Sequence, residues 1–304
     1  MERATNGPVR VDLEGASERI LEIGGIVYLL GGIDTGKTTF AFELLSKASR
    51  AGRSCALVDA NIDQSAVGPP TTCGVRFIEP GSEVTIDSVR DADGLAFVGS
   101  LAPREHLLPI VVGTGKLIRR ARERGCEVIV VDTPSFVAGI YGQTLNYFLM
   151  DAARPDVVLA FERGGELEPL VGIAQRFTSA EVIETEIRDM PTRSAEEKMT
   201  FREQQFAAYF KETSRWRVRP TVFMPTVPPE FDHHMLDGLV VGMEDGEGSC
   251  VGIGVLEHDT AEDILRMVSP VTQGVRGLRL GSVRIDPGGR ARGPVSLRDL
   301  FGTE

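Results

Sequence analysis

Short apolar runs alternate with amphipathic segments along the first two thirds of the chain. In the runs, apolar and often β-branched residues stand together, as in buried strands. In the segments between them, apolar residues recur every three or four positions, as on one face of a helix. Strands are predicted at 26–30, 54–59, 95–98, 128–133, 157–161 and 181–187. Helices are predicted at 12–23, 37–51, 111–124, 142–153 and 167–177. This alternation predicts an α/β fold with a doubly wound, mostly parallel sheet and right-handed crossovers.

From about residue 218 the pattern changes to strands joined by glycine-rich turns. Strands are predicted at 239–243, 250–255 and 278–285, with a turn at 286–289. The predicted divisions of the chain are therefore an N-terminal segment with a short helix (1–25), a main α/β domain (26–217) and a small β-rich C-terminal domain (218–304). Residues 1–10 are expected to be disordered or loosely attached, and residues 71–93 are too mixed to assign.

A glycine-rich segment lies between the first predicted strand of the sheet and the helix that follows it. Gly31, Gly36, Lys37 and Thr38 fit the phosphate-binding pattern G-x-x-x-x-G-K-[ST]. In such a loop, backbone N–H groups and the positive end of the helix surround the phosphates of a nucleotide. Lys37 would reach the β- and γ-phosphates, and the Thr38 hydroxyl would reach Mg²⁺. The residues expected to bind the nucleotide are Gly32, Asp34, Thr35, Gly36, Lys37, Thr38 and Thr39.

Two of the predicted strands deliver an aspartate to the same edge of the sheet. Asp59 closes the strand 54–59, and Asp132 follows the apolar run 128–131. Because ligands of open α/β sheets bind beyond the carboxyl ends of the strands, both side chains are expected to point at the nucleotide. An acidic group in this place lies near Mg²⁺ in nucleoside triphosphatases. Thr38, Asp59 and Asp132 are therefore the candidate metal ligands.

Composition narrows the possible partners and compartments. The 33 basic and 44 acidic residues give a net charge of −11, which argues against broad, nonspecific nucleic-acid binding but leaves room for a local basic groove. The four cysteines lack C-x-x-C spacing, which favours free thiols over zinc. No apolar run is long enough to span a bilayer, and no signal peptide is recognisable at the N-terminus. A cytoplasmic protein without a membrane partner is expected.

Residues 193–211 are predicted to form a charged helix with an aromatic stripe of Phe206, Tyr209 and Phe210. One interpretation is a surface helix that the stripe holds in place. The other is a lid that closes over the phosphates and supplies arginines to the transferred group. The sequence favours the surface helix by a small margin.

Taken together, these features resemble the Clp1/Grc3 type of polynucleotide 5′-hydroxyl kinases, particularly their short prokaryotic members. The resemblance covers about residues 25–211, and the phosphate loop on its own is generic. It is carried, in chain order, by the loop 31–40, by 58–65 with 68–72, by 131–136 with 154–156, and by the lid-like segment 193–210.

The resemblance implies an ATP- and Mg²⁺-dependent enzyme that phosphorylates the 5′-hydroxyl end of RNA or DNA. Residues 26–217 would then form a P-loop kinase domain, with 193–211 as its lid. A carboxylate of the segment 59–64 would accept the proton of the hydroxyl, and lid arginines would stabilise the migrating phosphoryl group. The residues with catalytic roles would be Lys37, Asp59, Asp63, Arg193 and Arg202. The nucleic-acid end would be bound by Asn61, Gln64, Thr133 and Phe136.

Three departures from the family pattern bear on this expectation. Asn61 and Asp63 stand where the family has its second Asp and its Gly. An amide cannot accept a proton as a carboxylate does, so another carboxylate must serve or the activity is weakened. The segment 133–136 lacks the family's Gly-Trp, which would leave base stacking to Phe136. Lys198 stands where a lid arginine is common.

Other functions stay open alongside a 5′-hydroxyl kinase. The chain could be an ATPase or nucleotide switch that acts through a partner, a kinase of a small polar molecule, or a Clp1-like subunit that binds ATP without turnover. The absence of an N-K-x-D motif favours ATP over GTP. The sequence decides neither between RNA and DNA nor the oligomeric state.

Overall fold

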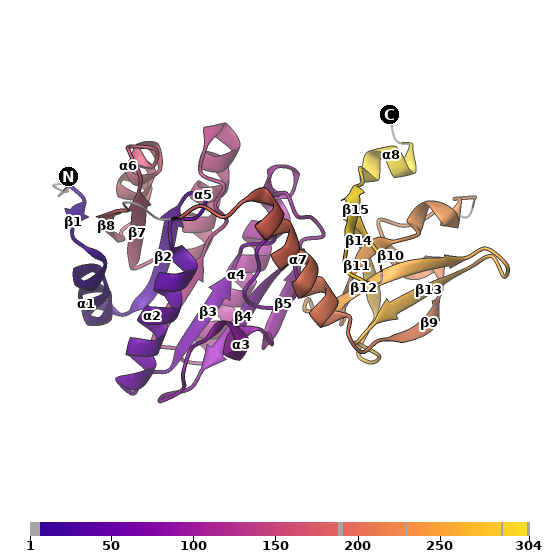
Figure 1. The fold of residues 1–304 in the computed structure, drawn as a ribbon, viewed down its shortest axis with the longest axis horizontal. Coiled ribbons are helices and arrows are strands. Elements are labelled where there is room, and N and C mark those ends of the chain that lie inside the picture. The colour runs from indigo at the N-terminus through magenta and orange to yellow at the C-terminus, as the bar shows by residue number, and fades with distance from the viewer. Residues whose placement is uncertain (1–6, 188–190, 229, 287, 303–304) are drawn as a thin grey trace.

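The computed structural model describes residues 7–187, 191–228, 230–286 and 288–302 (Figure 1). Over these residues, hydrogen bonds join 15 strands into one continuous sheet. Its N-terminal part is parallel and runs, in spatial order, through β1 (Val9–Arg10), β8 (Glu181–Glu186), β7 (Val157–Glu162), β2 (Gly25–Gly31), β6 (Val128–Asp132) and β3 (Cys55–Asp59). The prediction of a mostly parallel sheet is confirmed.

Helices cover both faces of this parallel part. One face carries α4 (Leu107–Glu123), α5 (Gly139–Ala153) and α6 (Glu168–Phe177), and the other carries α1 (Leu13–Ile23) and α2 (Lys37–Arg50). Successive residues of a strand point to opposite faces. Accordingly, Tyr28 of β2 packs with the first set of helices and Leu29 with the second. The sheet is therefore doubly wound, as predicted. Within the described ranges, no helix combines the length and the apolar character needed to cross a membrane.

Two segments differ from expectation. The unassigned stretch 71–93 contains β4 (Thr72–Ile78), antiparallel to β3, and the short helix α3 (Ile86–Val89). β4 pairs in turn with β5 (Gly94–Phe97), again antiparallel. Residues 1–10 are expected to be disordered or loosely attached. Of these, Val9 and Arg10 form β1, which pairs with β8, and residues 1–6 lie outside the described residues.

The remaining strands continue the sheet beyond β5. Cys250 of β12 is the partner of Leu95 in β5, so the C-terminal strands are hydrogen-bonded to the N-terminal part of the sheet. The first of them begins at Ser214, before the predicted boundary at 218. The division of the chain into domains stays a prediction. These strands are β9 (Ser214–Val218), β10 (Phe223–Met224), β11 (Leu239–Glu244), β12 (Cys250–Asp259), β13 (Ile264–Ser269), β14 (Gly277–Ile285) and β15 (Ala291–Pro294). Short helical segments are η1 (Pro103–Glu105), η2 (Pro220–Val222), η3 (His233–Leu236) and α8 (Leu297–Phe301).

The helix α7 (Ala195–Tyr209) connects the two parts of the molecule. Ser194 caps its first turn: the hydroxyl accepts from the Glu197 N–H, and the Glu197 carboxylate accepts from the Ser194 N–H. At the other end, Phe206 is fully buried against C-terminal strands, and the Tyr209 hydroxyl accepts from the Ile253 N–H at 2.9 Å. Figure 1 shows α7 running diagonally toward the C-terminal strands, and the segment that leads into it passes above α2. The aromatic stripe thus anchors the helix, while its first turn lies over the P-loop.

The junction between the two parts depends on a glycine. A Cβ atom on Gly242 of β11 would lie 2.3 Å from Cγ of Phe97, a ring that is 2% exposed. We predict that Gly242→Ala lowers the free energy of unfolding by about 1–3 kcal/mol, because a buried ring must be displaced. Gly277→Ala in β14 is the matched control, since its nearest neighbour would be 3.8 Å away. Equal denaturation midpoints for the two variants would contradict this account of the junction.

Candidate active site

The loop between β2 and α2 has the backbone shape that phosphate binding requires. Gly36 (φ 85°) and Asp34 (φ 53°) are left-handed, which turns the chain sharply into α2. A Cβ atom on Gly31 would lie 2.7 Å from the Thr35 hydroxyl, so only glycine fits there. The Thr35 hydroxyl closes the loop by donating to the Gly32 carbonyl at 3.1 Å. The start of α2 therefore presents its free N–H groups at the carboxyl edge of the sheet.

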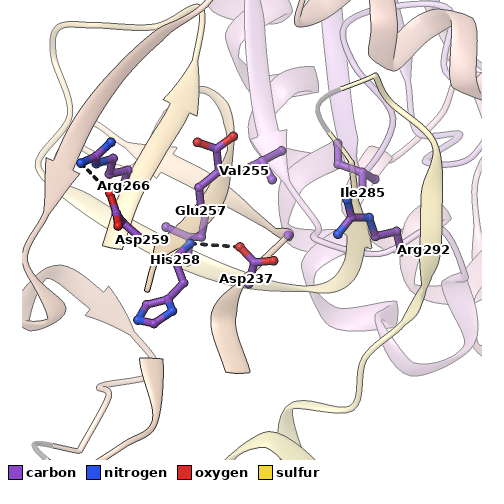
Figure 2. Close-up of a pocket in the computed structure, with 10 residues that line it drawn as sticks. Asp237, Val255, Glu257, His258, Asp259, Arg266, Ile285 and Arg292 are labelled. Carbon is purple, nitrogen blue, oxygen red and sulfur yellow. Dashed lines mark hydrogen bonds and ion pairs between the residues drawn. The ribbon is translucent and has the colours of Figure 1, made fainter. Parts of the chain in front are cut away.

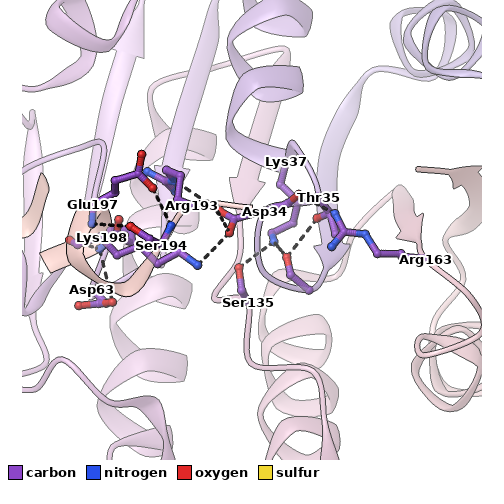
Figure 3. Close-up of polar contacts among 12 residues, drawn as sticks. Asp34, Thr35, Lys37, Asp63, Ser135, Arg163, Arg193, Ser194, Glu197 and Lys198 are labelled. Atoms are coloured by element: carbon purple, nitrogen blue, oxygen red, sulfur yellow. Dashed lines mark hydrogen bonds and ion pairs between the residues drawn. The ribbon is translucent and has the colours of Figure 1, made fainter. Parts of the chain in front are cut away.

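Lys37 is a buried cation inside this loop (Figure 3). Its Nζ donates to the carbonyls of Gly31 and Gly32, both at 2.8 Å, and to the Ser135 hydroxyl at 3.0 Å. The side chain forms no ion pair within 4.0 Å among the described residues. Burial lowers the pKa of Lys37 to about 8, although the carboxylates of Asp132 and Asp34 oppose the shift. An anion bound here would supply the missing counter-charge.

Thr38 and Asp132 meet beside Lys37 in a way that suits a divalent cation. The Thr38 hydroxyl donates to Oδ2 of Asp132 at 2.5 Å. The other oxygen, Oδ1, is buried and has no hydrogen-bond partner among the described residues. Burial raises the pKa of Asp132, against the effects of Lys37 and the Thr38 hydroxyl. In the described part of the chain, no three His, Cys, Asp or Glu side chains could hold a metal together. Oxygens of phosphate and water would therefore complete the coordination of Mg²⁺ at this pair.

The Asp59 carboxylate is engaged by the loop that follows β3, and its expected role at the nucleotide and the metal stays a prediction. It is 1% exposed, and its carboxylate accepts from the N–H groups of Asn61 (2.8 Å), Ala66 (2.6 Å) and Val67 (3.1 Å). Burial and the neighbouring Asp132 carboxylate raise the pKa of Asp59, and the three N–H groups oppose that rise. The carboxylate therefore holds the loop after β3 in shape, and, like that of Asp132, it is not among the groups that line the two cavities described next.

Two adjoining cavities open over the P-loop. The first, the α2 cavity, has a volume of about 320 Å³ and is bounded by the start of α2, Ile86 and Phe201. The second, the η1 cavity, has a volume of about 210 Å³ and lies between η1 and the loop after β6. Asp63, Phe136 and Lys198 line only the second. Both cavities are lined by Asp34, Asn61, Gln64, Ser135 and Arg193.

The first half of α7 closes over the point where the cavities meet. Nζ of Lys198 lies 2.8 Å from the Asp34 carboxylate, and Nε of Arg193 lies 3.3 Å from it. Burial raises the pKa of Asp34, but the two cations outweigh it and hold that pKa below its ordinary value. Farther along α7, Arg202 pairs with Asp63 at 2.6 Å. The helix is therefore packed as a surface helix, and its charged end lies against the P-loop; the interpretation as a lid stays a prediction.

In the segment after β6, some side chains are buried in the core and others line a cavity. Thr133 is fully buried, and its hydroxyl donates to the Leu29 carbonyl at 2.6 Å, so the structure does not bring it to the cavities. Phe136 lines the η1 cavity, as expected of a substrate-binding residue. Sequence reasoning missed Ser135, whose contact with Lys37 depends on the direction of one short loop. It also missed Arg163, which donates to the Asp34 carbonyl at 2.8 Å.

A separate cavity of about 350 Å³ lies among the C-terminal strands (Figure 2). In this cavity Arg266 lies 2.7 Å from Asp259, and the backbone N–H of His258 donates to the Asp237 carboxylate at 3.0 Å. It contains neither the P-loop nor α7. The site that combines a phosphate loop, a candidate metal pair and adjoining cavities is therefore the one over β2, β6 and β3.

The family model described as the mRNA cleavage and polyadenylation factor CLP1 P-loop matches residues 31–212. The chain belongs to this Clp1 family. A polyribonucleotide 5′-hydroxyl-kinase of Methanocaldococcus jannaschii is 23% identical to it, over 88% of this chain and 89% of the relative. One of Thermococcus kodakarensis is 25% identical, over 90% and 91%. The kinase Clp1 of Xenopus tropicalis is 26% identical, over 95% of this chain and 65% of that protein.

The fold agrees with a solved structure of the same family. Clp1p in its complex with Pcf11p superposes with a TM-score of 0.71, at 13% identity, over 90% of this chain and 78% of that one. At this identity the likeness establishes the fold.

The buried ammonium of Lys37 predicts how nucleotide affinity depends on pH. Binding a phosphate requires the charged form, whose pKa burial has lowered to about 8 in the free protein. Below about pH 8 this group should cause no pH dependence. Above it, binding must take up a proton, so the affinity should fall by up to about tenfold per pH unit.

Calorimetric titration from about pH 7 to about pH 10, in buffers of different ionisation enthalpy, measures both the affinity and the proton uptake. The control is Lys37→Arg, whose guanidinium stays charged over this range. An affinity for ATP that is constant over the range, without proton uptake, would show that Lys37 is charged throughout.

Proposed function

We propose that this protein transfers the γ-phosphate of ATP, with Mg²⁺, to the 5′-hydroxyl end of RNA. The observation that carries the proposal is that two cavities adjoin at the P-loop, where they share Asp34 and Ser135. The first of them contains Lys37 and Thr38, and Thr38 is the hydrogen-bond partner of Asp132. A phosphate donor in one cavity and an acceptor in the other would share a boundary at the P-loop. Relatives over nearly the whole length are named polyribonucleotide 5′-hydroxyl-kinases, which supports RNA as the acceptor.

The α2 cavity is the better place for ATP. It begins at Thr38 and Thr39 in the first turn of α2, where N–H groups bind α- and β-phosphates in P-loop proteins. The side chain of Phe201 supplies an aromatic wall for the base. Bound Mg²⁺ would neutralise charge that develops on the phosphate oxygens. Thr38 and Asp132 would hold it, since Asp132 has a buried oxygen free to coordinate.

The η1 cavity would then receive the 5′-hydroxyl. Asp63 lines it, and so does Asp34, whose carboxylate is occupied by two lid cations. We assign the proton-accepting role to Asp63, which meets one cation, Arg202, where Asp34 meets two. To Asp59 we assign a role in shaping the loop. Lys198 and Arg193 lie where they would contact the transferred phosphoryl group after leaving Asp34, and Arg202 would orient Asp63.

A second candidate is a nucleotide switch or ATPase without an RNA substrate. It is favoured by Asn61, an amide in the family's acidic position, and by the ion pair that engages Asp63. ATP hydrolysis that does not change when 5′-hydroxyl oligonucleotides are added would support it.

The first prediction from the proposal concerns the reaction itself. Labelled γ-phosphate should pass from ATP to the 5′ end of short 5′-hydroxyl RNA, and the same assay with DNA gives the preference between the two acceptors. Withholding Mg²⁺ or introducing Lys37→Ala should abolish the transfer while the circular dichroism spectrum stays unchanged, because catalysis here is positioning and charge stabilisation. Full transfer by Lys37→Ala would refute the mechanism.

The second prediction separates the two aspartates of the loop after β3. Asp63→Asn should lower kcat by about 10²- to 10⁴-fold with ATP affinity unchanged, since it removes the proton acceptor. Asp59→Asn should instead lower the melting temperature, because it weakens the buried contacts to three N–H groups. A large loss of kcat for Asp59→Asn at unchanged stability, with Asp63→Asn active, would reverse the assignment.

A further inference from the structure

An exposed pair of side chains, Arg104 and Tyr141, stands beside the η1 cavity. The guanidinium carbon of Arg104 lies 4.8 Å from the centre of the Tyr141 ring. Tyr141 is 44% exposed, and its neighbour Ile140 is 71% exposed. No carboxylate lies within 4.0 Å of the Arg104 guanidinium among the described residues. The exposed ring and the exposed guanidinium beside it are therefore both accessible to a ligand from solvent.

The pair bridges the two walls of the cavity. One wall includes Pro103, and Arg104 is the next residue of η1. The other wall includes Phe136, and Tyr141 lies in the first turn of α5, which packs beneath that loop. A Cβ atom on Gly142 would lie 3.1 Å from the Phe136 carbonyl, so this turn is held in close contact with the loop.

The second wall is also fixed by a buried side chain. The Asn146 amide donates to the Phe136 carbonyl at 3.1 Å, and its oxygen accepts from the Tyr28 hydroxyl at 2.8 Å. Both side chains are almost completely buried. The turn of α5 that carries Tyr141 is therefore held in place relative to the loop that lines the cavity.

We infer that Tyr141 and Arg104 form a stacking platform for the RNA base that follows the 5′-terminal nucleotide. This inference rests on the proposed function. With about 210 Å³, the η1 cavity is too small for several nucleotides, so the next base must lie outside it. An aromatic ring provides a face for any base, and a guanidinium above the ring adds a charge that a phosphate can contact.

The platform makes a specific prediction about which part of the substrate is recognised. Tyr141→Leu should raise KM for a 5′-hydroxyl RNA tetranucleotide about 5- to 100-fold, with kcat within about twofold, because one stacked base is lost. Replacing the second nucleotide of the substrate by an abasic one should raise the KM of the wild type by a similar factor. The same replacement should leave the KM of Tyr141→Leu unchanged. Tyr141→Trp should keep the KM of the wild type, because tryptophan also offers a ring for stacking. A merely structural role of Tyr141 does not predict this result.

The matched control is Phe148→Leu, which removes another aromatic ring from α5 that is 49% exposed. It lies two turns farther along the helix, away from the η1 cavity, and should leave KM unchanged. Equal KM increases for intact and abasic substrates in Tyr141→Leu, or no increase at all, would overturn the inference.

Binding measured without turnover keeps this test independent of the proposed function. Fluorescence anisotropy measures the affinity for the same labelled tetranucleotides, with and without the second base. Tyr141→Leu should lose affinity for the intact RNA by the same factor as its KM rises. If the wild type binds the intact RNA more tightly than the abasic one but transfers no phosphate, the platform stands and the kinase proposal fails. If it transfers phosphate without discriminating the two, the kinase stands and the platform fails.

Discussion

The whole site depends on a lysine that is buried with no carboxylate within 4.0 Å of its ammonium in the described part of the chain. Lys37 is held by two backbone carbonyls and a hydroxyl, which orient the ammonium but do not neutralise it. Burial of an unpaired charge is unfavourable, and this is why the pKa of Lys37 falls to about 8. The glycines of the loop and the first turn of α2 enclose the charge in a space suited to phosphate. A bound polyphosphate would satisfy the lysine and the free N–H groups of α2 together.

The position of α7 places two further cations beside the P-loop. Its aromatic end is fixed on the C-terminal strands, so the strands beyond β5 determine where its charged end lies. That end is held by Asp34, whose carboxylate is only 5% exposed and meets Lys198 and Arg193. A triphosphate bound at Lys37 would bring negative charge beside Asp34 and compete for the same cations. In this account the lid exchanges one set of anionic partners for another and need not unfold or swing away.

The sequence predicted the parts of the fold that follow from periodicity and from a local motif. The strand, glycine loop and helix around Lys37 form as expected, and Asp132 meets Thr38 because its strand lies directly beside β2. It could not predict the direction of side chains in loops. Asp59 turns inward because the chain after β3 curls back over its carboxylate, and Ser135 meets Lys37 through another short loop. The antiparallel β4 was missed because polar residues interrupt its apolar pattern, and the exposed Tyr141 because helical periodicity does not distinguish a surface ring from a functional one.

The most direct test of the account is a crystal structure with a non-hydrolysable ATP analogue, Mg²⁺ and a short 5′-hydroxyl RNA. We expect the triphosphate in the α2 cavity, with Lys37 moved from the loop carbonyls to the β- and γ-phosphates. We also expect Lys198 or Arg193 on the γ-phosphate, and the 5′-hydroxyl in the η1 cavity within hydrogen-bonding distance of Asp63. A 5′-hydroxyl bound outside the η1 cavity, or a γ-phosphate out of line with it, would contradict the claim that the two cavities form one phosphotransfer site.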